Sequence, residues 1–137
     1  MSPVLEGLVL VDTSAWIGFF RNRGSPEIKD QVGKLIEDDL AAAAGPIALE
    51  LIQGCRSRAE RQELEERLQA LHWLETEERH WYMAGRTAFS LRRTGITVSA
   101  IDALIATLAE SYGCVLLHQD SDFEHIARHT ALRLFAL

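Results

Sequence analysis

The chain has 137 residues, of which 47% are hydrophobic and 25% charged. This length and composition predict one ordinary globular domain over residues 1–137 and exclude a disordered or collagen-like polypeptide. Its apolar runs fall short of the roughly 18 residues that a membrane-spanning helix needs, and the net charge of −6 argues against nucleic-acid binding through bulk positive potential.

The cysteines and the cationic residues indicate the cellular compartment and the kind of binding partner. Cys55 and Cys114 are the two cysteines, and without a redox motif or a cationic N-terminal leader they favour a reducing cytoplasm, with both thiols acting as small hydrophobes. Among the 14 cations only Lys29 and Lys34 are lysines. Arginine suits bidentate contacts with phosphate or carboxylate, so the chain is compatible with RNA or with an acidic partner.

The first half of the chain alternates short apolar runs with helical patterns. Proline at the start of a helical pattern and glycine at its end mark the boundaries. The runs without polar residues are typical of strands buried on both faces. The predicted elements are strands at 8–11 and 40–44 and helices at 15–20, 26–39 and 46–52.

The second half continues this alternation. Ser99 and Asp102 have the spacing of a capping box at the start of an apolar helix. Trp81, Ala84, Ala88 and Leu91 are the predicted inner face of the helix over 77–93. The remaining predicted elements are helices at 58–71, 99–112 and 120–129 and strands at 72–74, 115–117 and 132–134.

Isolated aromatic and imidazole side chains receive structural interpretations. The spacing of Trp16, Trp73 and Trp81 favours packing in the core over stacking on bases. His72 and His80 are predicted at the surface or at a strand edge.

Strands alternating with helices predict an α/β domain of three layers, in which a central, mostly parallel sheet is flanked by helices. In such sheets the functional crevice lies beyond the carboxyl ends of the strands. Four carboxylates stand where this architecture places that rim. Asp12 ends the first strand, Glu50 follows the second strand by a helical turn, Asp102 lies at the start of a buried helix, and Asp120 follows the strand over 115–117.

Two carboxylates about 5 Å apart repel each other by about 3 kcal/mol at an effective dielectric constant of 20, so a bare cluster of four is costly. A divalent cation removes this cost, and a site of carboxylates without thiolate or imidazole suits Mg²⁺ or Mn²⁺. Each acid also has a simpler explanation. Asp12 and Asp120 can cap helices, Asp102 and Asp122 favour the helix dipole, and Glu50 can be a solvated helix residue. Their joint placement favours the metal site.

The sequence resembles PIN-domain proteins, specifically the VapC-type toxins of bacterial toxin–antitoxin pairs. The resemblance depends on four blocks in the family's order, which span nearly the whole chain: residues 10–17, 46–54, 99–106 and 116–123. It implies a Mg²⁺- or Mn²⁺-dependent endoribonuclease whose acidic quartet maps onto Asp12, Glu50, Asp102 and Asp120.

The resemblance also implies an additional acid at Asp122 and a supporting hydroxyl at Ser14, which orients an acid or a metal-bound water. The chain departs from the family at His118, where threonine is frequent, and this puts one hydrogen bond behind the metal ligands in doubt. The implied partners are a small VapB-like antitoxin, whose tail lies near the active site, and a second copy of the toxin. Exposed arginines would meet RNA phosphates, with candidates Arg21, Arg23, Arg56, Arg58, Arg92 and Arg93.

Two other functional classes stay open at the level of sequence. A non-catalytic module with the same fold would use the acidic groove to bind a basic peptide. A metal-dependent phosphohydrolase would act on small substrates. The sequence contains no phosphate-binding loop of the G-x-x-x-x-G-K-[ST] type and no G-x-G-x-x-G motif, so nucleotide-binding functions lack support.

Overall fold

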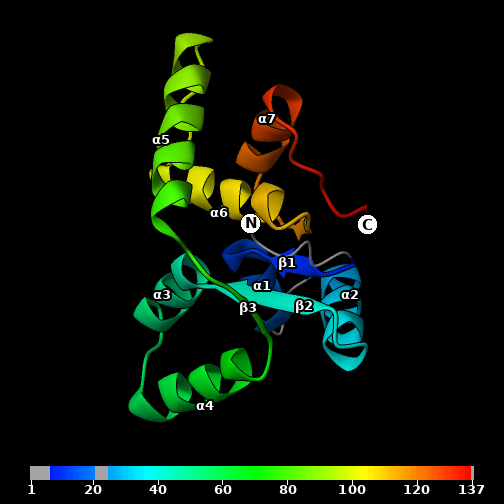
Figure 1. Ribbon diagram of the computed structural model, residues 1–137. Helices are drawn as coiled ribbons and strands as arrows, with labels where there is room; N and C mark the ends of the chain where they lie inside the picture. Colours follow the sequence, from blue (N-terminus) through cyan, green and yellow to red (C-terminus); the bar gives the residue numbers. More distant parts are fainter. Residues whose placement is uncertain (1–6, 21–24, 137) are drawn as a thin grey trace.

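The computed structural model describes residues 7–20 and 25–136 and contains one four-stranded sheet (Figure 1). The strand pairings within the described residues are all parallel, as the apolar runs predict. β1 lies between β2 and β4, and β3 is an edge strand. The strands are β1 (Val9–Val11), β2 (Ala41–Ala44), β3 (His72–Leu74) and β4 (Val115–Leu117).

The helices begin and end close to the residues that the sequence predicts. Pro26 and Pro46 lie in first turns, and the hydroxyls of Ser57 and Ser99 accept the N–H groups of Glu60 and Asp102 at 3.1 and 3.0 Å. The helices are α1 (Thr13–Phe20), α2 (Pro26–Glu37), α3 (Gly45–Gln53), α4 (Arg58–Gln69), α5 (Glu78–Arg93), α6 (Ala100–Ser111) and α7 (Asp122–His129). Within the described residues, none of these helices is both long and apolar enough to cross a membrane.

The order of the strands divides the helices into two groups. The chain adds β2 and then β3 on one side of β1, and returns through α5 and α6 to place β4 on its other side. Because crossovers between parallel strands are right-handed, the helices that connect β1, β2 and β3 and the helices that lead back to β4 are expected on opposite faces of the sheet. Figure 1 shows α5, α6 and α7 above the labelled strands, α4 below them, and α3 and α2 to their left and right. Helices therefore flank the central sheet, as predicted. The direction of winding reverses between β1 and β4, where ligands bind in open α/β sheets.

The core fixes the ends of the strands that carry the predicted acids. All four alanines of β2 are buried, which lets the helical layers approach the sheet closely. Leu10, Leu116 and Phe123 are fully buried, so β1, β4 and the first turn of α7 share one hydrophobic core. The rim beyond β1 and β4 is therefore supported by rigid elements.

Three predictions about the interior and the last strand are wrong. Trp73 and Trp81 are 46% and 58% exposed, whereas Trp16 is buried as predicted. The inner face of α5 instead contains His80, which is fully buried because its ring nitrogens bind the Glu77 N–H at 2.8 Å and the Ser111 hydroxyl at 3.0 Å. Residues 132–134 form a single parallel bridge from Leu134 to Leu116 in place of a strand.

Candidate metal centre

Asp12 lies directly after β1 and is only 3% exposed. Its backbone N–H donates to the Leu117 carbonyl at 2.9 Å, which joins the carboxyl ends of β1 and β4. Its Oδ2 accepts hydrogen bonds from the Ser14 N–H at 2.9 Å and from the Ser14 hydroxyl at 2.5 Å. Its Oδ1 is buried and has no hydrogen-bond partner within the described part of the chain. Since buried carboxylate oxygens are costly when unpaired, this oxygen is suited to a cation.

Two adjacent hydroxyls at the start of α1 connect the acids of different elements. The Thr13 hydroxyl donates to Glu50 Oε1 at 2.8 Å, so it joins α1 to α3. The Ser14 hydroxyl donates to Asp12 Oδ2, and its oxygen accepts the Gln119 N–H at 2.8 Å. Ser14 was predicted as a supporting residue, whereas no role at this site was predicted for Thr13. The signal for its role here is a pair of hydroxyls immediately after a strand-end aspartate.

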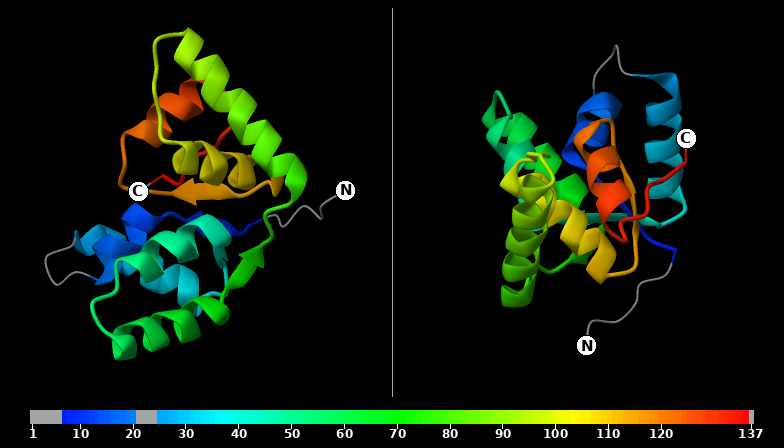
Figure 2. Two further views of the ribbon diagram at one scale, coloured as in Figure 1. Left: turned by 90° about the vertical axis from the view of Figure 1, so that its left-hand side faces the viewer. Right: turned by 90° about the horizontal axis from the view of Figure 1, so that it is seen from above.

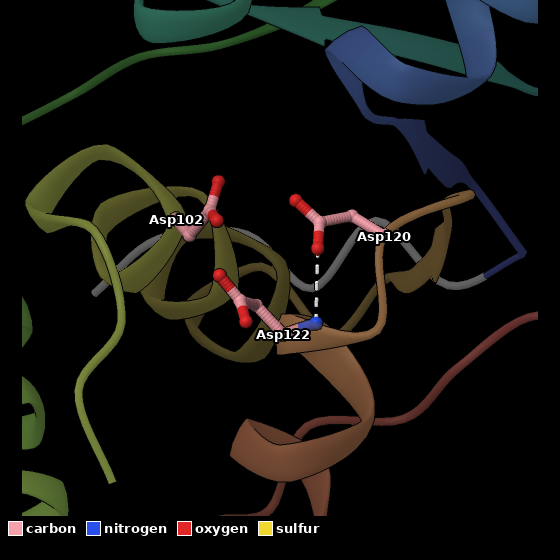
Figure 3. Close-up of side chains that lie close together, drawn as sticks. All are labelled: Asp102, Asp120 and Asp122. Carbon is pink, nitrogen blue, oxygen red and sulfur yellow. Dashed lines mark hydrogen bonds between the residues drawn. The ribbon is translucent and has the colours of Figure 1, made fainter.

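Three aspartates gather around one point at the same rim. Asp102 lies in the first turn of α6, Asp120 in the turn after β4, and Asp122 at the start of α7. One carboxylate oxygen of each lies within 4.8 Å of the others, and Figure 3 shows the three side chains turned toward one another. The Asp122 N–H donates to Asp120 Oδ1 at 3.0 Å, shown there as a dashed line. Acids 20 residues apart in sequence therefore share one small volume.

The environment of Asp102 disfavours its charged form. Partial burial is the largest cause, and the negative charges of Asp120 and Asp12 add to it, with a smaller contribution from Asp122. The hydrogen bond with Ser99 opposes these effects, and together they raise the pKa of Asp102 from 3.8 to about 7. A bound dication would stabilise the ionised form of this carboxyl group, which burial and the neighbouring charges disfavour.

The charged form of the Asp12 carboxyl group is disfavoured for related reasons. Burial raises the pKa of its carboxyl, the hydrogen bonds from Ser14 lower it, and the charge of Glu50 raises it further. The five predicted acids, Asp12, Glu50, Asp102, Asp120 and Asp122, are called the acidic rim below. Asp12 stands at its centre, since it interacts electrostatically with both Glu50 and Asp102. Among the described residues, neither Asp12 nor Glu50 belongs to a group of three acids within 4.8 Å, and Glu50 lies at the periphery of the rim because its electrostatic link is to Asp12.

The donor set of the acidic rim fits a hard divalent cation. Its side chains offer only carboxylate oxygens, which Mg²⁺ and Mn²⁺ prefer over the nitrogen and sulfur ligands typical of zinc sites. The unpaired Oδ1 of Asp12 and the raised pKa of Asp102 both indicate negative charge without compensation. The residues present therefore match the cation that the sequence predicts.

A groove of about 540 Å³ begins at Glu50 and runs between α1, α3 and α4. Its floor includes the buried Leu51 and Leu64, and its wall includes Ile17 and Phe20, which are 38% and 42% exposed. The remaining lining is largely charged: Glu50, Arg56, Glu60, Glu63 and Arg67, with Gly54 and Cys55 between them. The sequence predicts a groove near the acids but does not locate its walls.

A parallel α/β domain with acids converging at the reversal of its sheet defines a class of metal-dependent proteins. The model of the PIN-domain family matches residues 9–129. Ribonuclease VapC11 of Mycobacterium tuberculosis is 35% identical over 130 residues, which are 92% of this chain and 96% of that protein, and VapC ribonuclease Mb1587 of Mycobacterium bovis matches equally. The chain belongs to the PIN-domain family and, within it, to the VapC group.

Solved structures agree with this assignment at the level of fold. The crystal structure of FitAcB from Neisseria gonorrhoeae superposes with a TM-score of 0.74 at 17% identity, covering 94% of this chain and 97% of that one. DNA-bound VapBC from Salmonella typhimurium gives a TM-score of 0.74 at 21% identity, covering 93% and 96%. These likenesses confirm the fold that the resemblance implied.

Proposed function

We propose that this chain is a VapC-type ribonuclease, the toxin of a toxin–antitoxin pair, which hydrolyses RNA phosphodiester bonds with the help of Mg²⁺ or Mn²⁺. The observation that carries the proposal is the cluster of Asp102, Asp120 and Asp122, whose carboxylate oxygens lie within 4.8 Å of one another. Asp12 lies close enough to this cluster for its charge to raise the pKa of Asp102. The 35% identity to ribonuclease VapC11 supports RNA as the substrate. Because RNA is the proposed substrate, we also propose a cytoplasmic location.

The acids have distinct tasks in the proposed reaction. Asp102, Asp120 and Asp122 would hold the cation, with the buried Oδ1 of Asp12 as a further ligand. When bound, the cation lowers the pKa of a coordinated water and stabilises the negative charge that develops on the phosphate. Glu50, held by the Thr13 hydroxyl, helps to orient the attacking water from the periphery of the rim. Ser14 keeps the Asp12 carboxylate in one orientation.

Binding of RNA to an acidic protein requires local cations. Arg92 and Arg93 end α5, and Arg56 lies at the mouth of the groove beside Glu50. Together with Arg58 these exposed side chains stay candidates for phosphate contacts. The other two candidates, Arg21 and Arg23, lie outside the described residues.

The first test is cleavage of total cellular RNA by the purified, antitoxin-free chain with Mg²⁺ and with EDTA. We expect discrete cleavage products with Mg²⁺ and their loss with EDTA, because a carboxylate site without its cation neither activates water nor stabilises the phosphate charge. Mapping of the cut ends then gives the target sequence.

The same experiment separates the two alternatives. Binding of Mg²⁺ without cleavage of structured or unstructured RNA would favour the non-catalytic module that binds a basic peptide. Hydrolysis of a chromogenic phosphate ester in the absence of RNA cleavage would favour a small-molecule phosphohydrolase. Either result contradicts the proposed ribonuclease.

We also propose that the groove beside Glu50 seats a segment of a small VapB-like antitoxin. Apolar side chains of that segment would cover Ile17 and Phe20, the exposed apolar side chains that line this groove. A basic side chain of the segment would meet Glu50, where the groove joins the acidic rim. Occupation of this groove would block access to the cation and so inhibit cleavage.

Ile17→Asp tests the groove. A charge placed among its apolar contacts should weaken binding of the antitoxin encoded beside this chain by about thirtyfold or more, as loss of an interface hot spot does. Ile36→Asp on α2 is a matched control, because Ile17 and Ile36 are 38% and 39% exposed and Ile36 does not line the groove. Isothermal titration calorimetry measures both affinities. Equal affinities of the two variants would show that the antitoxin binds elsewhere.

The chain is further proposed to form a homodimer through the face that contains α3 and α5. Both helices lie on the side turned to the viewer in the left panel of Figure 2. Leu49 on α3 and Trp81, Tyr82 and Phe89 on α5 are 58% to 64% exposed, which is a large apolar surface for a monomer. A second copy would remove these side chains from water.

Replacement of Trp81 and Phe89 by alanine tests this interface. We expect the dissociation constant of the dimer to rise at least tenfold, since aromatic side chains provide most of the energy of such contacts. Sedimentation equilibrium measures the constant, and Ile36→Asp again serves as the control. A dimer unaffected by the double substitution would place the interface on another face.

A further inference from the structure

Side chains accept three of the backbone hydrogen bonds in the turn between β4 and α7. The Gln119 N–H donates to the Ser14 hydroxyl at 2.8 Å, and the Asp122 N–H donates to Asp120 Oδ1 at 3.0 Å. Between these bonds, the Asp120 N–H donates to Nδ1 of His118 at 3.0 Å. Each of these three backbone donors therefore binds a side-chain acceptor, and one acceptor is an imidazole.

This turn works against electrostatic repulsion. It must keep a carboxylate oxygen of Asp120 within 4.8 Å of oxygens from Asp102 and Asp122. Like charges at such distances push apart, so a turn without fixed hydrogen bonds would relax and carry Asp120 away from the other two. The Asp120 carbonyl accepts the Phe123 N–H at 3.2 Å, and the bond to His118 fixes the N–H side of the same residue.

The imidazole of His118 is well placed to act as a fixed acceptor. Its ring lies against the ring of Phe123, with the centroids 5.4 Å apart and the planes inclined by 56°. Phe123 is fully buried in the core, so it gives the half-buried His118 a rigid support. Because Nδ1 accepts a hydrogen bond, the neutral ring must have its proton on Nε2.

We propose that His118 is a positioning residue of the metal centre, whose Nδ1 holds the Asp120 N–H and so keeps the Asp120 carboxylate beside Asp102 and Asp122. The imidazole of His118 then supplies the hydrogen-bond acceptor that was in doubt because this position lacks a threonine hydroxyl. His118 acts through Asp120 and needs no contact with the cation or the RNA. The inference rests on the proposed function, because it assumes that these aspartates bind a cation.

A matched pair of substitutions isolates this hydrogen bond. His118→Thr supplies a hydroxyl acceptor, whereas His118→Val has the same shape without it. Calorimetric titration with Mn²⁺ should give affinities for the wild-type chain and for His118→Thr that agree within about threefold. His118→Val should bind Mn²⁺ about tenfold more weakly or worse, as is usual when a group supporting a metal ligand is lost. His118→Asn, whose side-chain oxygen can also accept the bond, should resemble the threonine variant.

The nitrogen chemical shifts of His118 in a ¹⁵N-labelled wild-type sample give a second readout that needs no variant. We expect an unprotonated Nδ1 and a protonated Nε2, and the opposite tautomer would overturn the proposal even if His118→Val failed to fold. Equal Mn²⁺ affinities of the threonine and valine variants would overturn it as well. Failure of the wild-type chain to bind Mn²⁺ would instead contradict the proposed function, so the two failures are distinguishable.

Discussion

Asp12→Asn should lower Mg²⁺-dependent RNA cleavage by about a hundredfold or more while the protein stays folded. Asparagine matches aspartate in size, and its side-chain oxygen can still accept the hydrogen bonds from Ser14. The negative charge at the centre of the acidic rim is lost, and with it the buried Oδ1 that we assign to the cation. Cleavage rates with saturating Mg²⁺, together with circular dichroism, measure the two parts of this prediction.

The same substitution should stabilise the protein in the absence of metal. Burial raises the pKa of Asp12 above its ordinary value of 3.8, so at any pH above that value this group lowers the stability of the fold, and a neutral amide removes that cost. Asp30→Asn is the control, because Asp30 is exposed on α2 away from the rim. Undiminished cleavage by Asp12→Asn, or an equal loss with Asp30→Asn, would contradict the assignment of Asp12.

The effect of Mg²⁺ on stability should grow strongly with pH. The pKa of Asp102 is about 7 in the folded protein against an ordinary value of 3.8. Between these values the folded state retains a proton that the unfolded state has released, so the free energy of unfolding without metal falls as pH rises. Above about pH 7 the destabilisation is fully present. Mg²⁺ binds the ionised carboxylates, so its affinity rises over the same range.

Melting temperatures with Mg²⁺ and with EDTA test this dependence. At about pH 8, Mg²⁺ at a concentration well above its dissociation constant should raise the melting temperature by about 5 °C. At about pH 5 the protonated Asp102 should reduce this difference to nearly zero. A difference that is independent of pH would mean that the cation binds groups other than the acidic rim.

The order of elements could be predicted from the sequence because local signals mark every boundary. The apolar runs that became β1, β2 and β4 are uninterrupted, and proline, glycine or a capping serine delimits most helices. The parallel sheet followed from these runs, and its geometry then placed Asp12 and Asp120 at one rim. Asp102 and Asp122 were predictable by the same argument, since each begins a helix that faces that rim.

The errors arose where partners distant in sequence decide the outcome. His80 and Trp81 are neighbours, and hydrophobicity alone favours the tryptophan as the buried residue. The structure buries His80 instead, because the Ser111 hydroxyl on α6 and the Glu77 N–H satisfy its ring. The hydrogen bond between Thr13 and Glu50 spans 37 residues, so its existence also depended on tertiary structure.

The most direct test of the account is a crystal structure of the chain soaked with Mn²⁺, with an anomalous difference map collected near the manganese absorption edge. We expect a single strong site or a close pair of sites among the carboxylates of Asp12, Asp102, Asp120 and Asp122. Manganese bound elsewhere, with these carboxylates left to water alone, would contradict it.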